Sequence, residues 1–549
     1  MKMGNNAKDF YLKEWEIWYT YTTSLRPTKV DLKSLTDCLV KSELAHLSML
    51  KDGYTVWNSG DGMMRGNTSV DSSGKTFFID ENEETKIPDG FAGEAWYQCA
   101  HFRFSELRLF NAYPSLPPNY VRAFLGKYIL HKNEQEYRIH LYPILTIYET
   151  GVMSVEFRRI SPSNEISLGE FIKHAVNATQ IPFDKAEVPP ALSKLASSAY
   201  MRTAVNWNMR ERAKLLKLEK NHANTIDERT VLDDDKDFTF KISPLSLSDK
   251  NQKEWLYTLA LTIFDAVAYL LFEPKNKKNF IFWGQPVSVD FDGHWVGRPH
   301  IYLCDFSDQQ ETASLNEEIN KHSFTKILMQ SFEFPEEMKK KFLPEDSRLF
   351  EDCSAYLGEA LSLWVWSKKG IKQQEPFNDG NRGHLIYDKQ ATMRLHDYVY
   401  ILHRRLLNET LQLKDYDQVM SVRRELLELE QKISEVSAFG EIRELLKNGW
   451  SQMGLDGIKN RIEKALLLQQ EAKSNKETRL YRKIGITLTV LFGLASIPII
   501  ANDILKPVYS WFNWPRPEDE VSFQLLLLTV VFVIITSAAI GIFKLTNNE

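Results

Sequence analysis

Two long apolar stretches near the C-terminus dominate the hydrophobic pattern of this chain. They cover residues 484–502 and 521–543, and neither contains Asp, Glu, Lys or Arg. A helix rises about 1.5 Å per residue, so each stretch is long enough to cross a bilayer core of about 30 Å. The pattern predicts transmembrane helices over 484–504 and 521–543, joined by an external loop at 505–520. The alternative is a buried hairpin of a soluble protein, which charge-free stretches of this length disfavour.

Charged residues beside these stretches predict their orientation. The basic residues before the first stretch are Lys473, Lys476, Arg479, Arg482 and Lys483, and Lys544 follows the second. The connecting loop has only Lys506 and Arg516 against several carboxylates. By the positive-inside rule, the large body and the short tail at 544–549 face the cytoplasm. We therefore expect a multi-pass protein of the cell inner membrane with both termini cytoplasmic.

The first section of the chain, 1–218, mixes helical and strand-like patterns. Strand-like runs occur at 76–79 and 137–142, and the residues from 168 onward are rich in helical patterns. This section is predicted to be an N-terminal α+β cytoplasmic domain. The polar residues 220–236, with three consecutive Asp, are interpreted as a loop or linker.

A second α+β cytoplasmic section is predicted over 219–388. Residues 255–272 are apolar, but they include Asp265 and are followed by a lysine-rich turn, which favours a buried helix over a membrane span. Strands are predicted at 280–283, 287–291 and 301–304.

A helical stalk is predicted from 389 to 483. Apolar residues such as Leu426, Leu429 and Ile433 recur at helical spacing, with an interruption at 448–450. The last helix is expected to run unbroken from near Gly457 into the membrane. The predicted fold is thus an α+β cytoplasmic body, a long helical stalk and two C-terminal transmembrane helices.

Composition narrows the classes of function. With 549 residues and 43% hydrophobic residues the chain can form two or three domains, and a net charge of −5 predicts no direct nucleic-acid partner. The four cysteines are far apart in the sequence, which indicates reduced thiols in a reducing compartment. We assign no metal ligands from them. Residues 60–66 lack the Lys-Ser/Thr of a phosphate-binding loop. No nucleophile motif is recognisable, so the protein is not expected to be an enzyme.

One face of the first apolar stretch is small and polar. At about 100° per residue, Gly485, Thr489, Ser496 and Asp503 lie within about 40° of one another, with Phe492 among them. Two helices cannot enclose an aqueous path, so several chains would have to share a pore. This face is predicted to line it, with the second span surrounding the first. The alternative is that small residues ease helix contact. Pro498 predicts a kink in the same stretch.

The external loop carries a partial match to a known signature. A cytosolic α+β body, long helices, a basic flank, a first span with Gly and Thr, and a second apolar span together resemble the CorA family of metal-ion transporters. In that family a Gly-Met-Asn signature followed by an aromatic residue lies at the outer mouth of the pore. This chain has Trp511-Phe512-Asn513-Trp514 there, so Asn513 and Trp514 match whereas Gly and Met do not. The resemblance covers the chain from about residue 389 onward, by layout more than by identity.

The resemblance implies a homopentamer in which the first spans line the pore. The missing Gly-Met puts selective uptake of hydrated Mg²⁺ in doubt, although carboxylates at the mouth still attract cations. Divergent CorA-like proteins act as membrane effectors associated with type III CRISPR antiviral systems, where a nucleotide second messenger activates them. This chain is similar to them in layout. The leading hypothesis is therefore a ligand-gated CorA-like channel or effector, with the lipid bilayer, other copies of itself and a small nucleotide as partners.

Two segments of the body are weak candidates for the ligand site. One is a strand-rich run with aromatic, acidic and basic side chains: Asp290, Asp292, His294, Trp295, Arg298 and His300. The other is a glycine-containing turn with Asn381, Arg382 and His384. An ordinary surface hairpin or loop explains each segment as well.

Two other functions stay open at this point. A constitutive divalent-cation transporter, for Mg²⁺ or another cation, explains the polar face but not the altered signature. A membrane-anchored enzyme or scaffold explains the large body and leaves the polar face as packing.

Overall fold

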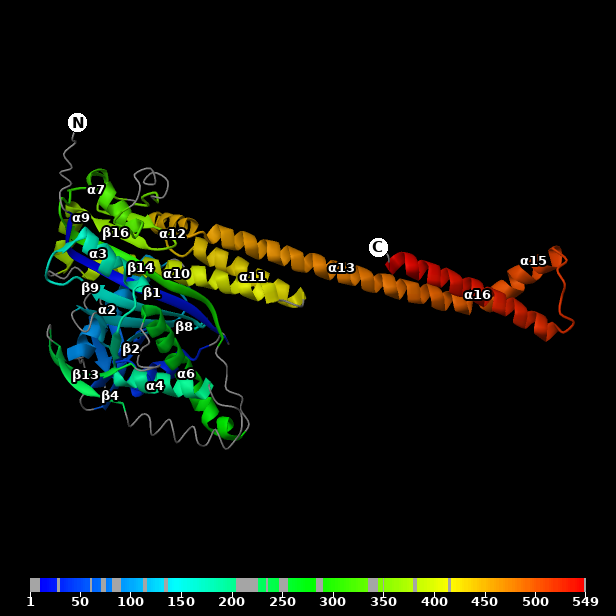
Figure 1. Cartoon of the computed structure of the whole chain (residues 1–549), viewed down its shortest axis with the longest axis horizontal. Coiled ribbons are helices and arrows are strands. Elements are labelled where there is room, and N and C mark those ends of the chain that lie inside the picture. Colours follow the sequence, from blue (N-terminus) through cyan, green and yellow to red (C-terminus); the bar gives the residue numbers. More distant parts are fainter. Residues whose placement is uncertain are drawn as a thin grey trace. The chain divides into compact units, whose positions relative to one another are not determined.

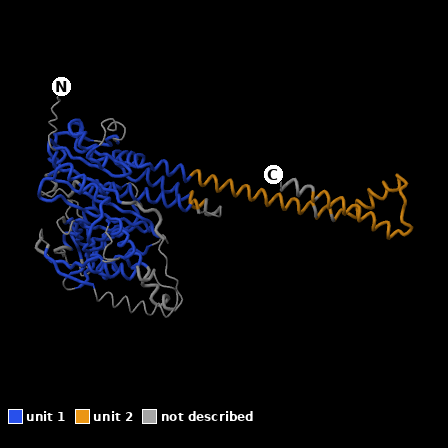
Figure 2. Tube along the Cα trace, viewed as in Figure 1, with its two compact units in different colours: residues 1–409, 424–462 blue, residues 410–423, 463–549 orange. Residues whose placement is uncertain are grey.

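The computed structural model describes most of the chain and divides it into two units. The described residues are 10–26, 30–59, 62–70, 76–80, 90–111, 116–132, 137–203, 226–233, 236–245, 255–282, 290–333, 344–348, 350–378, 383–412 and 416–547. Unit 1 comprises Met1–Glu409 and Arg424–Ile462, and unit 2 comprises Thr410–Arg423 and Glu463–Glu549 (Figure 2). Each unit is considered by itself below.

Strands build the centre of unit 1 (Figure 1). They are β1 (Tyr11–Arg26), β2 (Leu47–Leu50), β3 (Tyr54–Ser59), β4 (Gly62–Val70), β5 (Thr76–Asp80), β6 (Tyr120–Phe124), β7 (Tyr128–Lys132), β8 (Tyr137–Tyr148), β9 (Val152–Ile160), β10 (Ile166–Ser167), β11 (Lys185–Val188), β12 (Arg229–Asp233), β13 (Lys236–Pro244), β14 (Asp290–Phe306), β15 (Cys353–Leu357) and β16 (Ser362–Trp366). The expected strands at 76–79, 137–142 and 301–304 are confirmed as parts of β5, β8 and β14.

These strands form one large, mostly antiparallel sheet. Its order is β15-β16-β14-β1-β9-β8-β6-β2-β3-β4-β5, and only the β14–β16 pair is parallel among the described pairs. The long strand β1 lies in the middle, where it pairs with β9 on one side and β14 on the other. Strands from before and after residue 218 therefore share one sheet, and the α+β body is continuous across that point.

The described helices lie in both units, and only helices of unit 1 pack on the two faces of this sheet. In chain order they are α1 (Leu32–Lys41), α2 (Gly90–Leu109), α3 (Leu168–His174), the 3-10 helix η1 (Val176–Gln180), α4 (Pro190–Thr203), α6 (Leu256–Phe282), α7 (Ala313–Leu328), α9 (Lys368–Asn378), α10 (Gly383–Gln412), α11 (Tyr416–Ser434), α12 (Gly440–Gln452), α13 (Leu455–Ala495), α14 (Ile497–Ile499), the π-helix η3 (Ile500–Leu505), α15 (Lys506–Trp511) and α16 (Glu520–Asn547). The expected buried helix at 255–272 is confirmed in α6, where Leu259, Ile263 and Val267 are buried.

The alternation of side chains along β1 gives the sheet two cores. Trp15, Ile17 and Tyr19 point into one core, which includes residues of α1, α3, α4 and α6. Trp18 points the other way, into a core that includes residues of α2, α10 and α12. Successive side chains of a strand point to opposite faces, so one strand contributes to both layers.

Polar side chains of α10 hold this helix against the sheet. Gln390 Nε2 donates to Glu156 Oε1 at 3.0 Å, and Arg394 Nε donates to the same carboxylate at 2.6 Å. One turn later, Asp397 Oδ1 accepts from Arg298 Nη1 of β14 at 2.7 Å. Positions 390, 394 and 397 follow helical spacing and therefore share the face that meets the sheet. All of these side chains are buried.

Three local expectations are wrong. Residues 280–282 belong to α6 rather than to a strand, because short apolar runs fit either structure by pattern alone. Part of the expected linker at 220–236 is strand β12, which pairs with β13 and places Val231 against the small core of Ile129, Phe240 and Ile242. Helix α12 runs through residues 448–450, where an interruption was expected.

The α10–sheet contacts generate a stability prediction. Replacing Arg394 with Ala leaves the buried Glu156 carboxylate without its cation, so the free energy of unfolding should fall by about 3–5 kcal/mol. Urea denaturation of the full-length protein, followed by circular dichroism, measures the change.

The matched control is Lys13→Ala, which removes the solvent-exposed pair with Glu165. Its effect should stay within about 1 kcal/mol, since exposed pairs contribute little. Equal losses for the two variants would show that α10 is not fixed by its buried charge pair.

Candidate functional site

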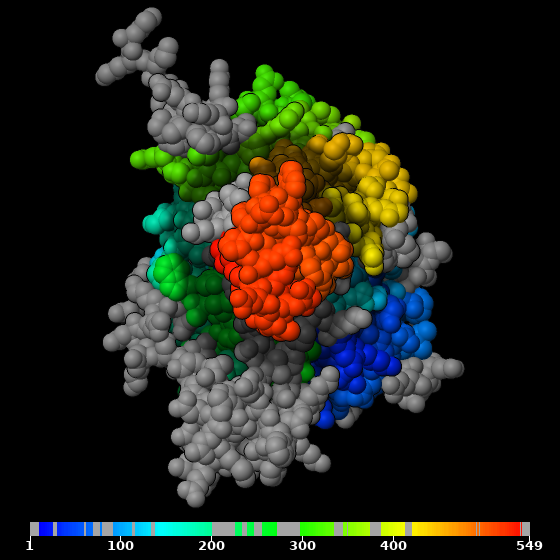
Figure 3. Space-filling view, turned by 90° about the vertical axis from the view of Figure 1, so that its right-hand side faces the viewer, coloured from blue at the N-terminus to red at the C-terminus, as the bar shows by residue number. Residues whose placement is uncertain are grey.

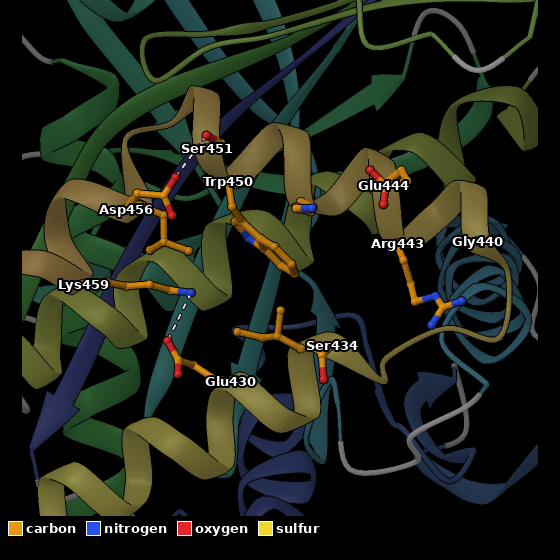
Figure 4. Close-up of a pocket in the computed structure, with 12 residues that line it drawn as sticks. Glu430, Ser434, Gly440, Arg443, Glu444, Trp450, Ser451, Asp456 and Lys459 are labelled. Carbon is orange, nitrogen blue, oxygen red and sulfur yellow. Dashed lines mark hydrogen bonds and ion pairs between the residues drawn. The ribbon is translucent and has the colours of Figure 1, made fainter.

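A hollow of about 690 Å³ lies between α11, α12 and the start of α13, within unit 1 (Figure 4). Most of its lining side chains are polar or charged, they come from three helices, and one tryptophan lies among them. The lining residues are Glu430, Ile433, Ser434, Gly440, Arg443, Glu444, Lys447, Trp450, Ser451, Leu455, Asp456 and Lys459. A volume of this size suits a small molecule, since such pockets measure about 300–1,000 Å³.

A tight corner between α12 and α13 shapes one end of the hollow. Gly454 has φ +76°, a left-handed conformation that glycine adopts at helix C-termini without a Cβ penalty. Its N–H donates to Ser451 O at 3.0 Å, and α13 begins at the next residue, Leu455. Ser451 Oγ then donates to Asp456 Oδ2 in the first turn of α13 at 3.0 Å. The corner thereby brings Ser451, Asp456 and Lys459 together (Figure 4).

Close packing of α12 on α10 forms the floor behind the hollow. A Cβ added to Gly449 would lie 2.2 Å from His396 Nε2, so only glycine allows this approach. His396 contacts Thr392 O through Nδ1 at 3.0 Å and Leu446 O through Nε2 at 3.1 Å. Burial, followed by the positive charge of Arg298, lowers the pKa of His396 to about 3. The ring is therefore neutral at physiological pH, and its single N–H donates to one of the two carbonyls.

Trp450 occupies the centre of the lining. Its side chain is 5% exposed and makes an edge-to-face contact with the His396 ring at 5.3 Å. The indole Nε1 is buried and has no hydrogen-bond acceptor among the described residues. A buried donor without a partner is costly, so this N–H favours an acceptor from a bound molecule.

Charges separate toward the two ends of the hollow. Figure 4 shows Arg443 at one end, beside Gly440 and Ser434, and Lys459, Asp456 and Glu430 at the other. Lys459 Nζ lies 3.3 Å from Glu430 Oε1, which links α13 to α11. No carboxylate of the described residues is paired with Arg443 or Lys447. These two cations are available to bind an anion.

The strand-borne candidates lie on β14, at some distance along the sequence from the hollow. Arg298 and His300 are fully buried under α10, where Arg298 binds Asp397 and His300 Nδ1 contacts Gln390 Oε1 at 3.0 Å. Burial favours a raised pKa for Asp397, but the charges and hydrogen bonds of His300 and Arg298 outweigh it and lower that pKa. Their polar groups contact Asp397 and Gln390 of α10, and a role for these two residues in ligand binding stays a prediction.

The other weak candidates cannot be placed as side chains. Asp290, Asp292, His294 and Trp295 have their backbone in β14, but their side chains lie outside the described part of the structure. Residues Asn381 and Arg382 lie outside the described residues, as does the side chain of His384 at the start of α10.

Unit 2 contains the apolar helices. The stretch Glu520–Ala538 of α16 is long and apolar enough to cross a membrane. Leu455–Gly493 and Ile497–Trp511 satisfy the same criterion only together, and they are bent by 41° at the break between them. The expected kink near Pro498 is thus confirmed, and up to two of the described helices have the length and composition of membrane spans.

The predicted pore-lining residues fall on both sides of this bend. Gly485, Thr489 and Phe492 lie in α13, Ser496 at the break and Asp503 in the π-helix η3. The spacing of about 100° per residue holds only as far as Ala495, so Asp503 does not follow the same helical count. Nothing within 4 Å would meet a Cβ at Gly485, and the Phe492 side chain is 70% exposed. Their role in a pore stays a prediction.

The loop between α15 and α16 is an aromatic cluster, at the end of unit 2 that faces the viewer in orange-red in Figure 3. Phe512 and Trp514 stack with ring centroids 5.6 Å apart, and Trp511 is 82% exposed. Asn513 has φ +47°, a left-handed conformation that Asn tolerates in turns. Asn513, the residue that matches the CorA signature, therefore closes the turn here.

Comparisons with known proteins return nothing: no family model, no curated protein and no solved structure matches this chain. Within the described residues no group of three or more His, Cys, Asp or Glu is placed to hold a metal ion. None of the four cysteines forms a disulfide; Cys99, Cys304 and Cys353 are buried and Cys38 is half-buried.

Sequence reasoning missed the residues of the hollow. Arg443 and Lys447 are one turn apart on α12, and that spacing is visible in the sequence. Their proximity to Glu430 and Asp456 depends on two helix corners, which no local pattern specifies. The available signal was Gly449 beside Trp450, which sequence reasoning took as a helix break instead of a packing contact.

The close approach at Gly449 gives a test of the helix packing. Gly449→Ala forces the His396 ring to move, so the free energy of unfolding should fall by about 1–3 kcal/mol. The control is Gly457→Ala in α13, where nothing lies within 4 Å of an added Cβ. That change should stabilise the helix by about 0.5–1 kcal/mol. A stabilising effect of Gly449→Ala in thermal denaturation would contradict the described packing of α12 on α10.

Proposed function

We propose that this chain is an oligomeric membrane channel or effector of CorA-like plan, in which a ligand bound to unit 1 opens a pore or perturbs the membrane. The observation that carries the proposal is the exposed apolar surface of unit 2. Leu491, Leu525 and Val533 are each more than half exposed in the single chain. Soluble monomers rarely expose contiguous apolar surface of this kind, whereas lipid and neighbouring membrane helices cover it.

The polar side chains in these helices are compatible with a membrane. Thr489 Oγ1 donates to Gly485 O at 2.9 Å, and Thr536 Oγ1 donates back to Phe532 O. Ser496 Oγ bonds to Phe492 O at 2.7 Å. Hydroxyls that bond to the carbonyl four residues earlier need no water. They fit either a helix contact or a pore wall, so they permit the pore without requiring it.

Oligomerisation follows from the number of apolar helices. Two spans per chain cannot surround an aqueous path, so a pore needs several copies around an axis. The resemblance to the CorA family favours a homopentamer with the α13 ends innermost. Gly493 already packs against Ile535 of α16, where an added Cβ would lie 3.1 Å from Ile535 Cγ2, so α16 covers one side of α13 within the chain.

Helix α13 offers a route from ligand to membrane. Its first turns contribute Leu455, Asp456 and Lys459 to the hollow, and the same helix continues to Ala495 in the apolar stretch. A change in the position of the first turns alters the direction of one continuous helix. By the same resemblance, the ligand is a nucleotide second messenger and the biological role is type III CRISPR antiviral defence, with no enzymatic step in this chain.

Topology provides the first functional prediction. The basic flank before residue 484 should keep unit 1 in the cytoplasm, so cysteines introduced by Ser510→Cys and Ser522→Cys should react with an impermeant maleimide in intact cells. The background lacks the four native cysteines. Cys replacement at Ser474, before the span, is the control and should react only after permeabilisation. External labelling at position 474 would reverse the orientation.

Ion flux through the proposed pore provides the second functional prediction. In liposomes, Phe492→Ala should raise flux without ligand, because it removes an apolar constriction, and Asp503→Asn should lower cation flux, because each subunit loses one charge at the mouth. Leu526→Ala in α16 is the control and should change flux little.

Two outcomes separate the alternatives. Wild-type flux that needs no ligand would favour a constitutive cation transporter. A monomer by mass measurement in nanodiscs, with Phe492→Ala equal to wild type, would leave α13 and α16 as an anchor and would overturn the channel.

A further inference from the structure

We propose that the hollow between α11, α12 and α13 binds a nucleotide, whose phosphate is held by Arg443 and Lys447 and whose hydroxyl or amino groups face Glu430 and Asp456. This inference deepens the proposed function by giving the ligand a chemical class and a place. Nucleotide binding to the hollow does not depend on the proposed function; only the effect of binding on the pore rests on it.

The cationic end of the hollow fits a phosphate. Arg443 and Lys447 are four residues apart on α12, so their side chains share one helix face. Guanidinium and ammonium groups form charge-assisted hydrogen bonds with phosphate oxygens, and neither cation is paired with a carboxylate of the described residues. Glu444 also lines this region, which leaves two cations against one carboxylate.

The opposite end fits hydrogen-bond donors. Glu430 and Asp456 are hydrogen-bond acceptors with one partner each: Lys459 Nζ lies 3.3 Å from Glu430 Oε1, and Ser451 Oγ donates to Asp456 Oδ2 at 3.0 Å. Carboxylates accept hydrogen bonds from sugar hydroxyls and from the amino groups of bases. A ligand with an anionic end and a donor-rich end therefore matches this separation of charge, and inorganic phosphate alone matches only half of it.

Trp450 gives an independent indication of a ligand. Its indole Nε1 is buried, finds no acceptor among the described residues, and belongs to a side chain that lines the hollow and is 5% exposed. Figure 4 shows the ring between the Arg443 end and the Lys459 end. An acceptor atom of a ligand lying along the hollow, between its two ends, would satisfy this donor.

The binding experiment uses the purified full-length protein in detergent and isothermal titration calorimetry. The probes are ATP, AMP and cyclic di-AMP, with adenosine and tripolyphosphate as controls that each carry half of the required chemistry. At least one nucleotide should bind more tightly than both controls. Arg443→Ala and Lys447→Ala should each weaken that binding by about tenfold or more. The exposed cation of α13 outside the hollow, Lys464, serves as the matched control, and Lys464→Ala should bind as wild type does.

A second pair of variants tests the orientation of the ligand. Glu430→Gln and Asp456→Asn should reduce the preference for the nucleotide over tripolyphosphate, while tripolyphosphate affinity stays the same or rises. A loss of folding would lower the affinity for both ligands together. The ratio of the two affinities therefore separates an effect on recognition from an effect on stability. The proposal is overturned if no nucleotide binds, or if Arg443→Ala and Lys447→Ala bind as wild type does.

The same variants separate this inference from the proposed function. Nucleotide binding at the hollow without any effect on liposome flux would remove the channel proposal and leave the site. Nucleotide-dependent flux that is unchanged in Arg443→Ala and Lys447→Ala would leave the channel proposal and remove the site.

Discussion

The buried contact of α10 with the sheet is the constraint on which the rest of unit 1 depends. Arg394 and Gln390 hold the Glu156 carboxylate in a region without solvent, where an unpaired charge is costly. This fixes the rotation of α10 about its axis, and hence the side on which His396 projects. His396 then sets the approach of α12 through Leu446 O and Gly449. The position of the hollow thus follows from a charge pair deep in the body.

Much of the secondary structure is predictable because its causes are local. Strand-like runs in the sequence predicted β5 and β8, and the two charge-free stretches predicted α16 and the end of α13. The pairing of β1 with β14 joins residues nearly three hundred positions apart, and no local pattern specifies such a pair. Strand β12 was missed because its Asp-rich neighbours resemble a linker, although Val231 packs in a small core. Helix or strand remained ambiguous at 280–282 for the same local reason.

The candidate site shows the same division between local and long-range causes. Arg298 and His300 looked like ligand residues because polar side chains in a strand-rich segment suit binding as well as a buried network. The contact of both residues with Asp397 on α10 depends on the tertiary fold, and the sequence pattern does not show it. Conversely, Arg443 and Lys447 were not singled out from the sequence, because their spacing on α12 is that of any solvated helix face. Their place in the lining of the hollow depends on Gly454, whose left-handed backbone turns the chain so that α13 begins beside α12.

A ligand in the hollow affects α13 only if it binds two positions of that helix with different affinity. The Lys459–Glu430 pair is the contact through which such a difference can arise, because it joins α13 to α11 at 3.3 Å across the lining. In the proposed orientation, a donor group of the ligand that engages Glu430 competes with Lys459 for that carboxylate. The competition weakens the contact between α11 and the first turns of α13. By linkage, if a ligand shifts the first turns of α13 toward one position, a change that favours that position must raise the affinity for the ligand by the same factor.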